Sequence, residues 1–434
     1  MKKVKLKLFS SAIAAFCGFL LLASSGCVKQ DASKAESVKN PSAATSLPEN
    51  TEIAAAQKII ENKPDAAIGY NTLAVAYIRR ARETGDFGLN TNAQTAVNRA
   101  LEIEPRNYDA QRLKASLLLT FHQFEEALSL GMQLQKDHLQ DPFVYGVLTD
   151  ANIELGNYKE AVDAVQKMVD LRPNMESYAR VALVRSLHGD SDGAIEAMSL
   201  AARIADPRDA EAQAWCLTHL GNEYLKVGRY EEGEKQYDAA LKLLPRYHLA
   251  LAGKGRARAA QNDYDAATKF LTDANNQVPN AENAILLGDI YTKQGNAEKA
   301  KQHYDLVEVI EDKLGAAGSQ KNLALFWADR DEKLDDALAI AQREFDARKD
   351  IYTADALAWT SYKKGRLSEA KTAIDAAMRL KTKDARILYH AGMIEKDSGN
   401  RKEAKRLLET ALKLNPSFDL LQAETARKVL QELS

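Results

Sequence analysis

The chain has 434 residues, of which 45% are apolar and 28% charged; its formal net charge is −2, and it contains 22 Gly and only 10 Pro. A collagen-like or disordered chain would need far more Gly and Pro, and a nucleic-acid-binding surface would need an excess of basic residues, so the composition excludes these classes. The apolar content is sufficient for a buried core, and at about 150 residues per domain the length suggests three domains.

Residues 1–26 have the pattern of a secretory signal peptide. Four lysines precede an apolar run from Phe9 to Leu22, which is shorter than the ~20 residues of a membrane span and ends in small residues. The sequence LASSGC that ends at Cys27 resembles the lipobox of bacterial lipoproteins. This resemblance implies cleavage before Cys27, acyl chains of the palmitate type on that cysteine, and stable membrane attachment. Val28 implies, by the same resemblance, the outer membrane of a Gram-negative cell. The alternative is an uncleaved membrane anchor with an incidental cysteine.

Residues 27–50 follow as a polar stretch. Removal of residues 1–26 takes away four Lys and no acid, which leaves 55 basic and 61 acidic residues and a net charge of −6. Residues 27–50 contain no aromatic residue, two Pro and many Ala, Ser and Lys, so they cannot bury enough apolar surface to fold. We expect a flexible tether between the lipid and a folded domain that faces the periplasm.

The eight prolines beyond this stretch recur at regular intervals. They are Pro64, Pro105, Pro142, Pro173, Pro207, Pro245, Pro279 and Pro416, with successive gaps of 41, 37, 31, 34, 38, 34 and 137 residues. A second series is Gly156, Gly189, Gly228, Gly295, Gly365 and Gly399, with gaps of 33, 39, 67, 70 and 34 residues. A helical bundle with accidental spacing does not explain these intervals, whereas a period near 34 indicates a repeat architecture.

The segment from Trp215 to Pro245 resembles the tetratricopeptide repeat. It carries Leu220, Gly221, Tyr224, Gly228, Tyr230, Tyr237, Ala240 and Pro245 at the positions of that family's pattern. The resemblance implies two short amphipathic helices per unit, in which Gly221 lets the helices approach, Gly228 permits the turn and Pro245 ends the second helix. Related units, with drift, extend from about residue 67 to 416.

We therefore predict an all-α fold, a superhelical α–α solenoid of the tetratricopeptide type with about ten helix-hairpin repeats. It is expected to occupy residues 51–434 as one domain in place of three, with a partial helix at about 51–63 and a polar closing helix at about 417–433, because end repeats need caps. The first unit has about seven extra residues near Arg82 to Gly88, which we expect to lengthen the loop between its two helices.

No catalytic constellation is found in the sequence. HExxH, CxxC, GxSxG and the Walker phosphate loop are absent, and the seven histidines are scattered over different units. Gly253-Lys254-Gly255 lacks the flanking strand and the further glycines of a phosphate loop. Cys216 has no disulfide partner in the folded domain and is interpreted as a small buried residue. We predict no enzyme activity, no cofactor and no metal site.

The concave surface of a solenoid can bind an extended peptide or a partner helix. The family resemblance implies that the second, fifth, ninth and twelfth residues of each first helix face this groove. The resulting candidates are aromatic-rich in the last three units and more polar in the middle: Phe326, Tyr352, Asp355, Trp359, Tyr362, Tyr389 and Met393, then Trp215, Asn222 and Arg256. Such residue types dominate interface hot spots. The alternative is that Trp359 and Tyr389 fill space between helices, because periodicity alone does not separate the two roles.

These features lead to three functional hypotheses. The first is a non-catalytic, lipid-anchored scaffold or assembly factor of the bacterial cell envelope, which binds a protein or peptide partner in its groove and no nucleic acid. It resembles the repeat lipoproteins that serve outer-membrane protein insertion, pilus-secretin assembly and polysaccharide export. The second is a sugar- or metabolite-binding protein, or an enzyme, that uses the groove around Asp355, His390 and Trp359. The third is a subunit of one fixed complex.

Overall fold

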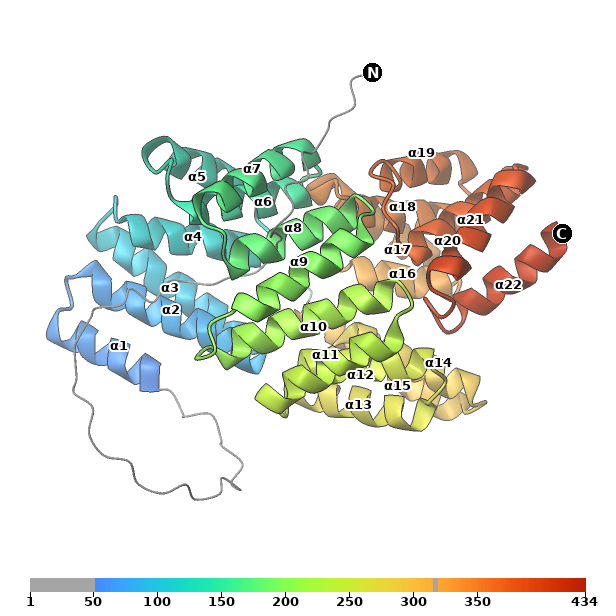
Figure 1. Cartoon of the computed structure of the whole chain (residues 1–434), viewed down its shortest axis with the longest axis horizontal. Helices are drawn as coiled ribbons and strands as arrows, with labels where there is room; N and C mark the ends of the chain where they lie inside the picture. Colours follow the sequence, from blue (N-terminus) through green and yellow to red (C-terminus); the bar gives the residue numbers. More distant parts are fainter. Residues whose placement is uncertain (1–50, 315–318) are drawn as a thin grey trace. The chain divides into compact units, whose positions relative to one another are not determined.

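The computed structural model describes residues 51–314 and 319–434. The predicted signal peptide at 1–26, the lipidation site Cys27 and the predicted tether at 27–50 lie outside the described residues. Within the described ranges the chain forms 22 α-helices and no β-strand (Figure 1), which confirms the predicted all-α fold. No helix in these ranges is both long enough and apolar enough to cross a membrane.

Twenty of these helices pair in chain order as ten hairpins, each with a first and a second helix. The pairs are α2 (Ala67–Thr84) with α3 (Gly88–Ile103), α4 (Tyr108–Thr120) with α5 (Phe124–Asp137), α6 (Pro142–Glu154) with α7 (Tyr158–Leu171), α8 (Met175–Leu187) with α9 (Ser191–Ile204), α10 (Ala210–Lys226) with α11 (Tyr230–Leu243), α12 (His248–Ala260) with α13 (Tyr264–Gln277), α14 (Ala281–Lys293) with α15 (Ala297–Leu314), α16 (Lys321–Asp329) with α17 (Leu334–Arg348), α18 (Ile351–Lys363) with α19 (Leu367–Ala377), and α20 (Ala385–Asp397) with α21 (Arg401–Leu414). The two remaining helices are α1 (Thr51–Asn62) and α22 (Gln422–Leu433). The ten predicted repeats and both end helices are therefore present.

Hairpin α10/α11 shows how the sequence sets the helix ends and the helix spacing. The Asp209 side chain accepts a hydrogen bond from a first-turn backbone N–H at 3.0 Å and caps α10. Gly228 in the turn has a φ of +72°, which glycine adopts without steric cost. A Cβ at Gly221 or Gly253 would lie 2.5 or 2.3 Å from the Tyr237 ring. The missing side chains therefore allow α10 and α12 to pack closely on α11.

The extra residues of the first repeat lengthen a helix and not a loop. Helix α2 has 18 residues, whereas the first helices α18 and α20 have 13 each. The turn between α2 and α3, residues 85–87, is as short as the turn 364–366 between α18 and α19. The expectation of a longer loop is wrong, because the sequence RRARE at 79–83 consists of strong helix formers that continue α2.

The contacts within the chain define two compact units. The smaller unit comprises residues 51–82 and 86–114, and the larger unit comprises residues 83–85 and 115–434. In the smaller unit the Asn107 side chain caps α4 and accepts a hydrogen bond from Asn71 of α2 at 2.9 Å. Ala67, Ala100 and Ala110 form its buried contact between α2, α3 and α4.

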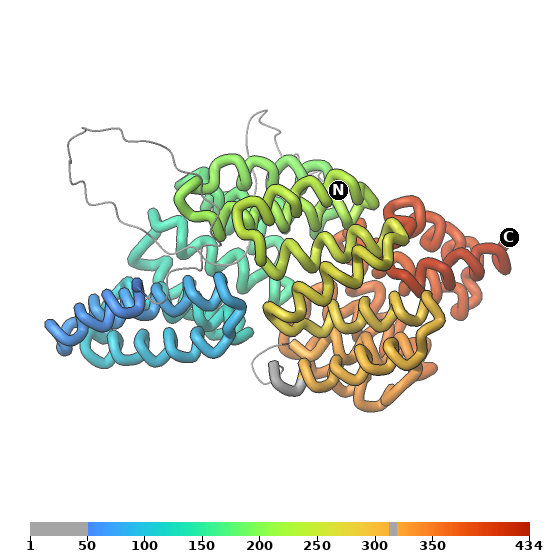
Figure 2. Tube along the Cα trace, turned by 90° about the horizontal axis from the view of Figure 1, so that it is seen from below, coloured from blue at the N-terminus to red at the C-terminus, as the bar shows by residue number. Residues whose placement is uncertain are grey.

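In the larger unit, hairpins that are far apart in sequence pack on one another. Polar contacts between them include Tyr158 with Ile351, Glu154 with Arg348, Leu187 with Thr382, and Leu225 with Asn415, which are separated by 193, 194, 195 and 190 residues. Ile153 and Leu187 share one apolar core with Ile351 and Ile394. Hairpins α16/α17, α18/α19 and α20/α21 therefore lie on α6/α7, α8/α9 and α10/α11, each five repeats earlier. Helices α12 to α15 connect these two layers along the chain and pack side by side in chain order (Figure 2).

The turn glycines fall into two groups because of this packing. Gly156, Gly189 and Gly228 face backbone atoms of the later hairpins, and a Cβ at Gly189 would lie 2.6 Å from the Lys381 carbonyl oxygen. A Cβ at Gly295, Gly365 or Gly399 would meet nothing within 4 Å. The turn glycine of the repeat thus occurs in two environments. Only at Gly156, Gly189 and Gly228 does the missing side chain also permit contact between the layers.

Candidate functional site

The predicted groove residues of the last repeats lie where α16, α18 and α20 meet the segment around the start of α22. Trp359 of α18 donates its Nε1–H to the Asp329 carboxylate of α16 at 2.7 Å. The same oxygen accepts a hydrogen bond from the Gln422 side chain at 2.6 Å. Burial raises the pKa of Asp329 above its usual range, and the nearby Arg386 guanidinium opposes the shift. One carboxylate therefore ties together three helices.

Aromatic rings surround Trp359. The His390 ring stacks on it with centroids 4.1 Å apart, and the Tyr362 and Tyr389 rings lie at 5.2 and 5.6 Å. His390 is fully buried, with its Nδ1 2.9 Å from an oxygen of Asp355, and its Nε2 has no hydrogen-bond partner. His390 thus contacts both other residues of the predicted ligand-binding alternative, Asp355 and Trp359.

Five of the ten predicted groove residues are buried. The exposed fraction is 3% for Asp355, Trp359 and Tyr389, 4% for Phe326 and 8% for Met393, and the aromatic residues among them share a core with Ala426 and Val429 of α22. The expectation of an open groove does not hold for these five, because α16, α18, α20 and α22 approach one another across the concave side. Trp359 and Tyr389 fill space between helices, as the alternative interpretation stated.

The other five predicted groove residues are half-buried: Tyr352, Tyr362, Trp215, Asn222 and Arg256. In the middle repeats the Asn222 side chain accepts hydrogen bonds from Tyr237 at 2.8 Å and from Arg256 at 3.1 Å. The Trp215 ring lies 3.8 Å from that of His219, and burial lowers the pKa of His219 to about 3, so this imidazole is neutral. Their role in partner binding stays a prediction.

A cavity of about 290 Å³ opens beside Tyr352 and Asp355. Its walls come from the N-terminal ends of α14, α16, α18 and α20 and from the connection between α21 and α22, and they carry both signs of charge: Glu282, Asp355 and Asp384 against Lys226, Lys321 and Arg386. Asp384 caps α20 by accepting the Arg386 N–H at 2.9 Å. The arrangement suits a small polar ligand or a charged side chain of a partner.

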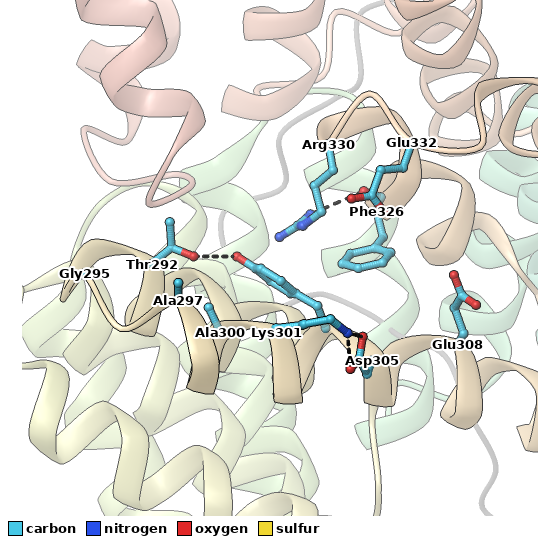
Figure 3. A pocket seen from close by; sticks show the side chains of 11 residues that line it. Thr292, Gly295, Ala297, Ala300, Lys301, Asp305, Glu308, Phe326, Arg330 and Glu332 are labelled. Carbon is cyan, nitrogen blue, oxygen red and sulfur yellow. Dashed lines mark hydrogen bonds and ion pairs between the residues drawn. The ribbon is translucent and has the colours of Figure 1, made fainter.

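A larger cavity, of about 660 Å³, lies along one face of α15 (Figure 3). Phe326 and Arg330 at the end of α16 form the facing wall. The Arg330 guanidinium lies 4.1 Å from the Tyr304 ring and 4.3 Å from the Phe326 ring, and it donates to Asp289 of α14 at 2.6 Å. This cation therefore links the seventh hairpin to the eighth at the place where the cavity separates α15 from α16.

Two carboxyl groups near this junction titrate close to neutral pH. Burial raises the pKa of Asp289 to about 7, although the Arg330 guanidinium opposes the shift. Burial also raises the pKa of Glu311 to about 7, and the carboxylates of Glu282 and Glu344 add to that shift.

Several residues of the site have no signal in the repeat pattern. Arg330 follows the end of α16, and Phe418 and Gln422 lie after the last repeat, so none of these three occupies a groove position of a first helix. Asp329 does occupy one, three residues after Phe326, but it was not among the predicted residues. Cys216 is buried as predicted, and burial raises the pKa of its thiol. In residues 51–314 and 319–434, no three His, Cys, Asp or Glu side chains are grouped so that they could hold a metal ion.

Comparison with known proteins confirms tetratricopeptide repeats. Family models described as tetratricopeptide repeat match residues 219–282 and residues 281–307 and 385–418. The anaphase-promoting complex subunit 3 of Schizosaccharomyces pombe is 23% identical over 192 residues, which are 44% of this chain and 28% of that subunit. This chain therefore spans less than a third of that relative.

Two solved structures align with much of this chain. A tetratricopeptide repeat protein from Parabacteroides merdae is 18% identical with a TM-score of 0.34, and the alignment covers 64% of this chain and 99% of that one. The human IFIT1 dimer with PPP-AAAA is 16% identical with a TM-score of 0.45, and the alignment covers 83% and 87% of the two chains.

Proposed function

We propose that this chain is a non-catalytic protein-interaction scaffold. Tetratricopeptide repeats generally serve as such scaffolds and typically bind protein partners, so the repeat matches at 219–282, 281–307 and 385–418 are the observation that carries the proposal. The relative in Schizosaccharomyces pombe is named as a subunit of a complex, which is in line with it.

The half-buried residues of the concave side are the proposed contact surface. Trp215, Arg256, Tyr352 and Tyr362 belong to the residue types that dominate interface hot spots, and each still presents part of its side chain to solvent. The buried Trp359 and Tyr389 support this surface from beneath.

Co-purification from cross-linked membranes tests the scaffold function. Wild-type protein should recover specific partner proteins, and Trp215→Ala and Tyr362→Ala should each reduce that recovery. Lys159→Ala is the matched control, because Lys159 is exposed on a second helix and pairs with Asp163 of the same helix. Equal recovery with all three variants contradicts the proposed surface, and recovery of no specific protein by the wild type contradicts the scaffold.

We further propose that the scaffold is a lipoprotein of a bacterial cell envelope, anchored through Cys27 and facing the periplasm. The support is the apolar run from Phe9 to Leu22, the sequence LASSGC and the polar stretch 27–50. Growth with a clickable palmitate analogue should label the wild type in the membrane fraction, whereas Cys27→Ala should be unlabelled. Equal labelling of both contradicts the anchor.

A small-ligand binder is the second candidate function. The observation in its favour is the 290 Å³ cavity with Asp355 and Arg386 in its wall, beside the Asp355–His390 pair. A panel of sugars and metabolites in a thermal-shift assay tests it. One compound that stabilises the wild type and fails to stabilise Asp355→Asn supports this candidate, and no stabilisation by any compound contradicts it.

A further inference from the structure

We propose that the C-terminal segment, residues 417–434, is an internal ligand of the groove, and that the partner which replaces it presents an aromatic side chain followed by acidic ones. The proposal rests on the proposed scaffold function and specifies the chemistry of the partner.

The C-terminal segment contacts three of the first helices. The Phe418 ring lies 5.6 Å from the Tyr389 ring of α20, and Asp419 accepts a hydrogen bond from Arg386 of the same helix at 3.2 Å. Further contacts are Gln422 with Asp329 of α16 and Glu424 with Lys293 of α14. The segment therefore touches the first helices of the seventh, eighth and tenth repeats.

These contacts exceed what an end cap requires. A cap covers the apolar face of the last hairpin, here α20/α21, and Ala426 and Val429 of α22 serve that purpose together with Leu408 of α21. The hydrogen bond from Gln422 to Asp329 spans 93 residues, and the ion pair of Glu424 with Lys293 spans 131. The first half of the segment therefore binds across the groove, in addition to the capping of the last hairpin by Ala426 and Val429.

The charges identify what the groove accepts. Both acids of the segment's first half face a cation of a first helix, Asp419 facing Arg386 and Glu424 facing Lys293. Phe418 supplies the aromatic contact to Tyr389. A partner helix or peptide with an aromatic residue, an adjacent acid and a second acid about one and a half turns later reproduces all three contacts.

A partner can reach this end of the groove while the C-terminal segment is still bound there. The Arg386 side chain is 40% exposed while its partner Asp419 is 12% exposed, so an incoming carboxylate reaches the guanidinium before Asp419 has left. Residues 416–421 form turns rather than helix, so this stretch has few backbone hydrogen bonds to break.

A peptide exchange experiment tests the proposal. The probe is a fluorescent peptide with the sequence of residues 416–434, added to the full chain and followed by anisotropy. The double variant Phe418→Ala/Asp419→Asn weakens the binding of the chain's own segment to the groove. It should bind the probe at least about tenfold more tightly than the wild type, because its own segment occupies the groove for less of the time. Lys428→Ala, an exposed change on α22, should bind like the wild type. Addition of Arg386→Met to the double variant should abolish binding.

A second measurement does not depend on the variants. In the wild type, hydrogen exchange of amides in 417–434 should be at least about tenfold faster than in α21, because the segment detaches without unfolding of the repeats. Equal protection of the two regions overturns the proposal, and so does equal or absent probe binding by wild type and double variant. The segment is then an end cap only, whereas the scaffold function is judged separately by the co-purification of partners.

Discussion

The Tyr158 hydroxyl accepts a hydrogen bond from the backbone N–H of Ile351 at 2.9 Å, across 193 residues of sequence. The acceptor lies in the third hairpin, α6/α7, and the donor at the start of the ninth, α18/α19, so the two are six hairpins apart. The contact is buried, so water does not compete for it. It shows that hairpins far apart in sequence pack on one another in the larger unit.

Tyr158→Phe should destabilise the larger unit. The substitution keeps the ring and removes the hydroxyl that accepts the buried Ile351 N–H, and an orphaned buried donor costs about 1–3 kcal/mol. Urea unfolding measures the change in free energy. Tyr264→Phe is the control, because the Tyr264 hydroxyl donates to the nearby Asn262 at an exposed position. Equal free energies for the two variants contradict a structural role of the contact between layers.

Gly189→Ala should cost more stability than Gly365→Ala. Both glycines have nearly the same φ, +74° and +77°, so the strain of a left-handed alanine, about 1–2 kcal/mol, is common to both. Only at Gly189 does the added Cβ meet the Lys381 carbonyl oxygen at 2.6 Å, and such overpacking adds about 1–3 kcal/mol. Thermal and urea unfolding of the two variants give the difference. A larger cost at Gly365 contradicts the packing of the later hairpins on the earlier ones.

Trp359→Ala should lower the stability of the fold, and any loss of partner binding should follow from that. The ring is 3% exposed and packed between helices, so its loss should cost about 3–5 kcal/mol. Tyr362→Ala, at a half-buried position on the same helix, should cost clearly less. Unfolding experiments compare the two. An unchanged free energy of unfolding for Trp359→Ala together with lost partner recovery would show that this residue is an interface residue and not a core residue.

Glu311→Gln should change the pH dependence of stability. The folded-state pKa of Glu311, about 7, is above its usual value, so this carboxyl favours the folded state at acid pH and that contribution is lost as the pH rises through 7. The substitution should therefore leave stability near pH 5 almost unchanged and raise it near pH 8, by about 1–3 kcal/mol. Urea unfolding at both pH values measures this. The same gain at both pH values contradicts a buried, titrating carboxyl group.

Cys216 should not react with thiol reagents in the folded protein. The side chain is fully buried and burial raises the pKa of its thiol, so the thiolate is neither formed nor accessible. Mass spectrometry of the peptide containing Cys216 after iodoacetamide treatment gives the extent of modification. Rapid modification without urea contradicts the burial, and modification that follows unfolding agrees with it.

The repeat architecture was predictable from local signals. The turn glycines and most of the prolines stand at helix ends, and positions such as Gly221 and Tyr237 touch as the repeat pattern implies. Each of these signals acts within one hairpin or between neighbours, where a period near 34 residues is sufficient to detect it. The sequence at 79–83 also consists of strong helix formers, although we expected the extra residues to lengthen a loop.

The openness of the groove was not predictable in the same way. Repeat positions indicate which side of a first helix is concave, and Trp359 and Tyr389 do lie on that side. Whether the concave side is open depends on small rotations summed over several repeats and on a segment outside the repeats. The contact of Phe418 with Tyr389 depends on how several repeats and the C-terminal segment come together, and so do the hydrogen bonds that Asp329 accepts from Trp359 and Gln422. No single repeat carries a signal for these contacts.

Site-specific photo-cross-linking in living cells tests the central claim, that the concave side of the repeats binds a protein partner. A photoreactive phenylalanine analogue is placed at Trp215, at Tyr362 and, as a control, at the exposed Lys159. The account predicts that the same protein is captured from Trp215 and Tyr362 and is not captured from Lys159. Capture from none of the three positions, or equal capture from Lys159, contradicts it.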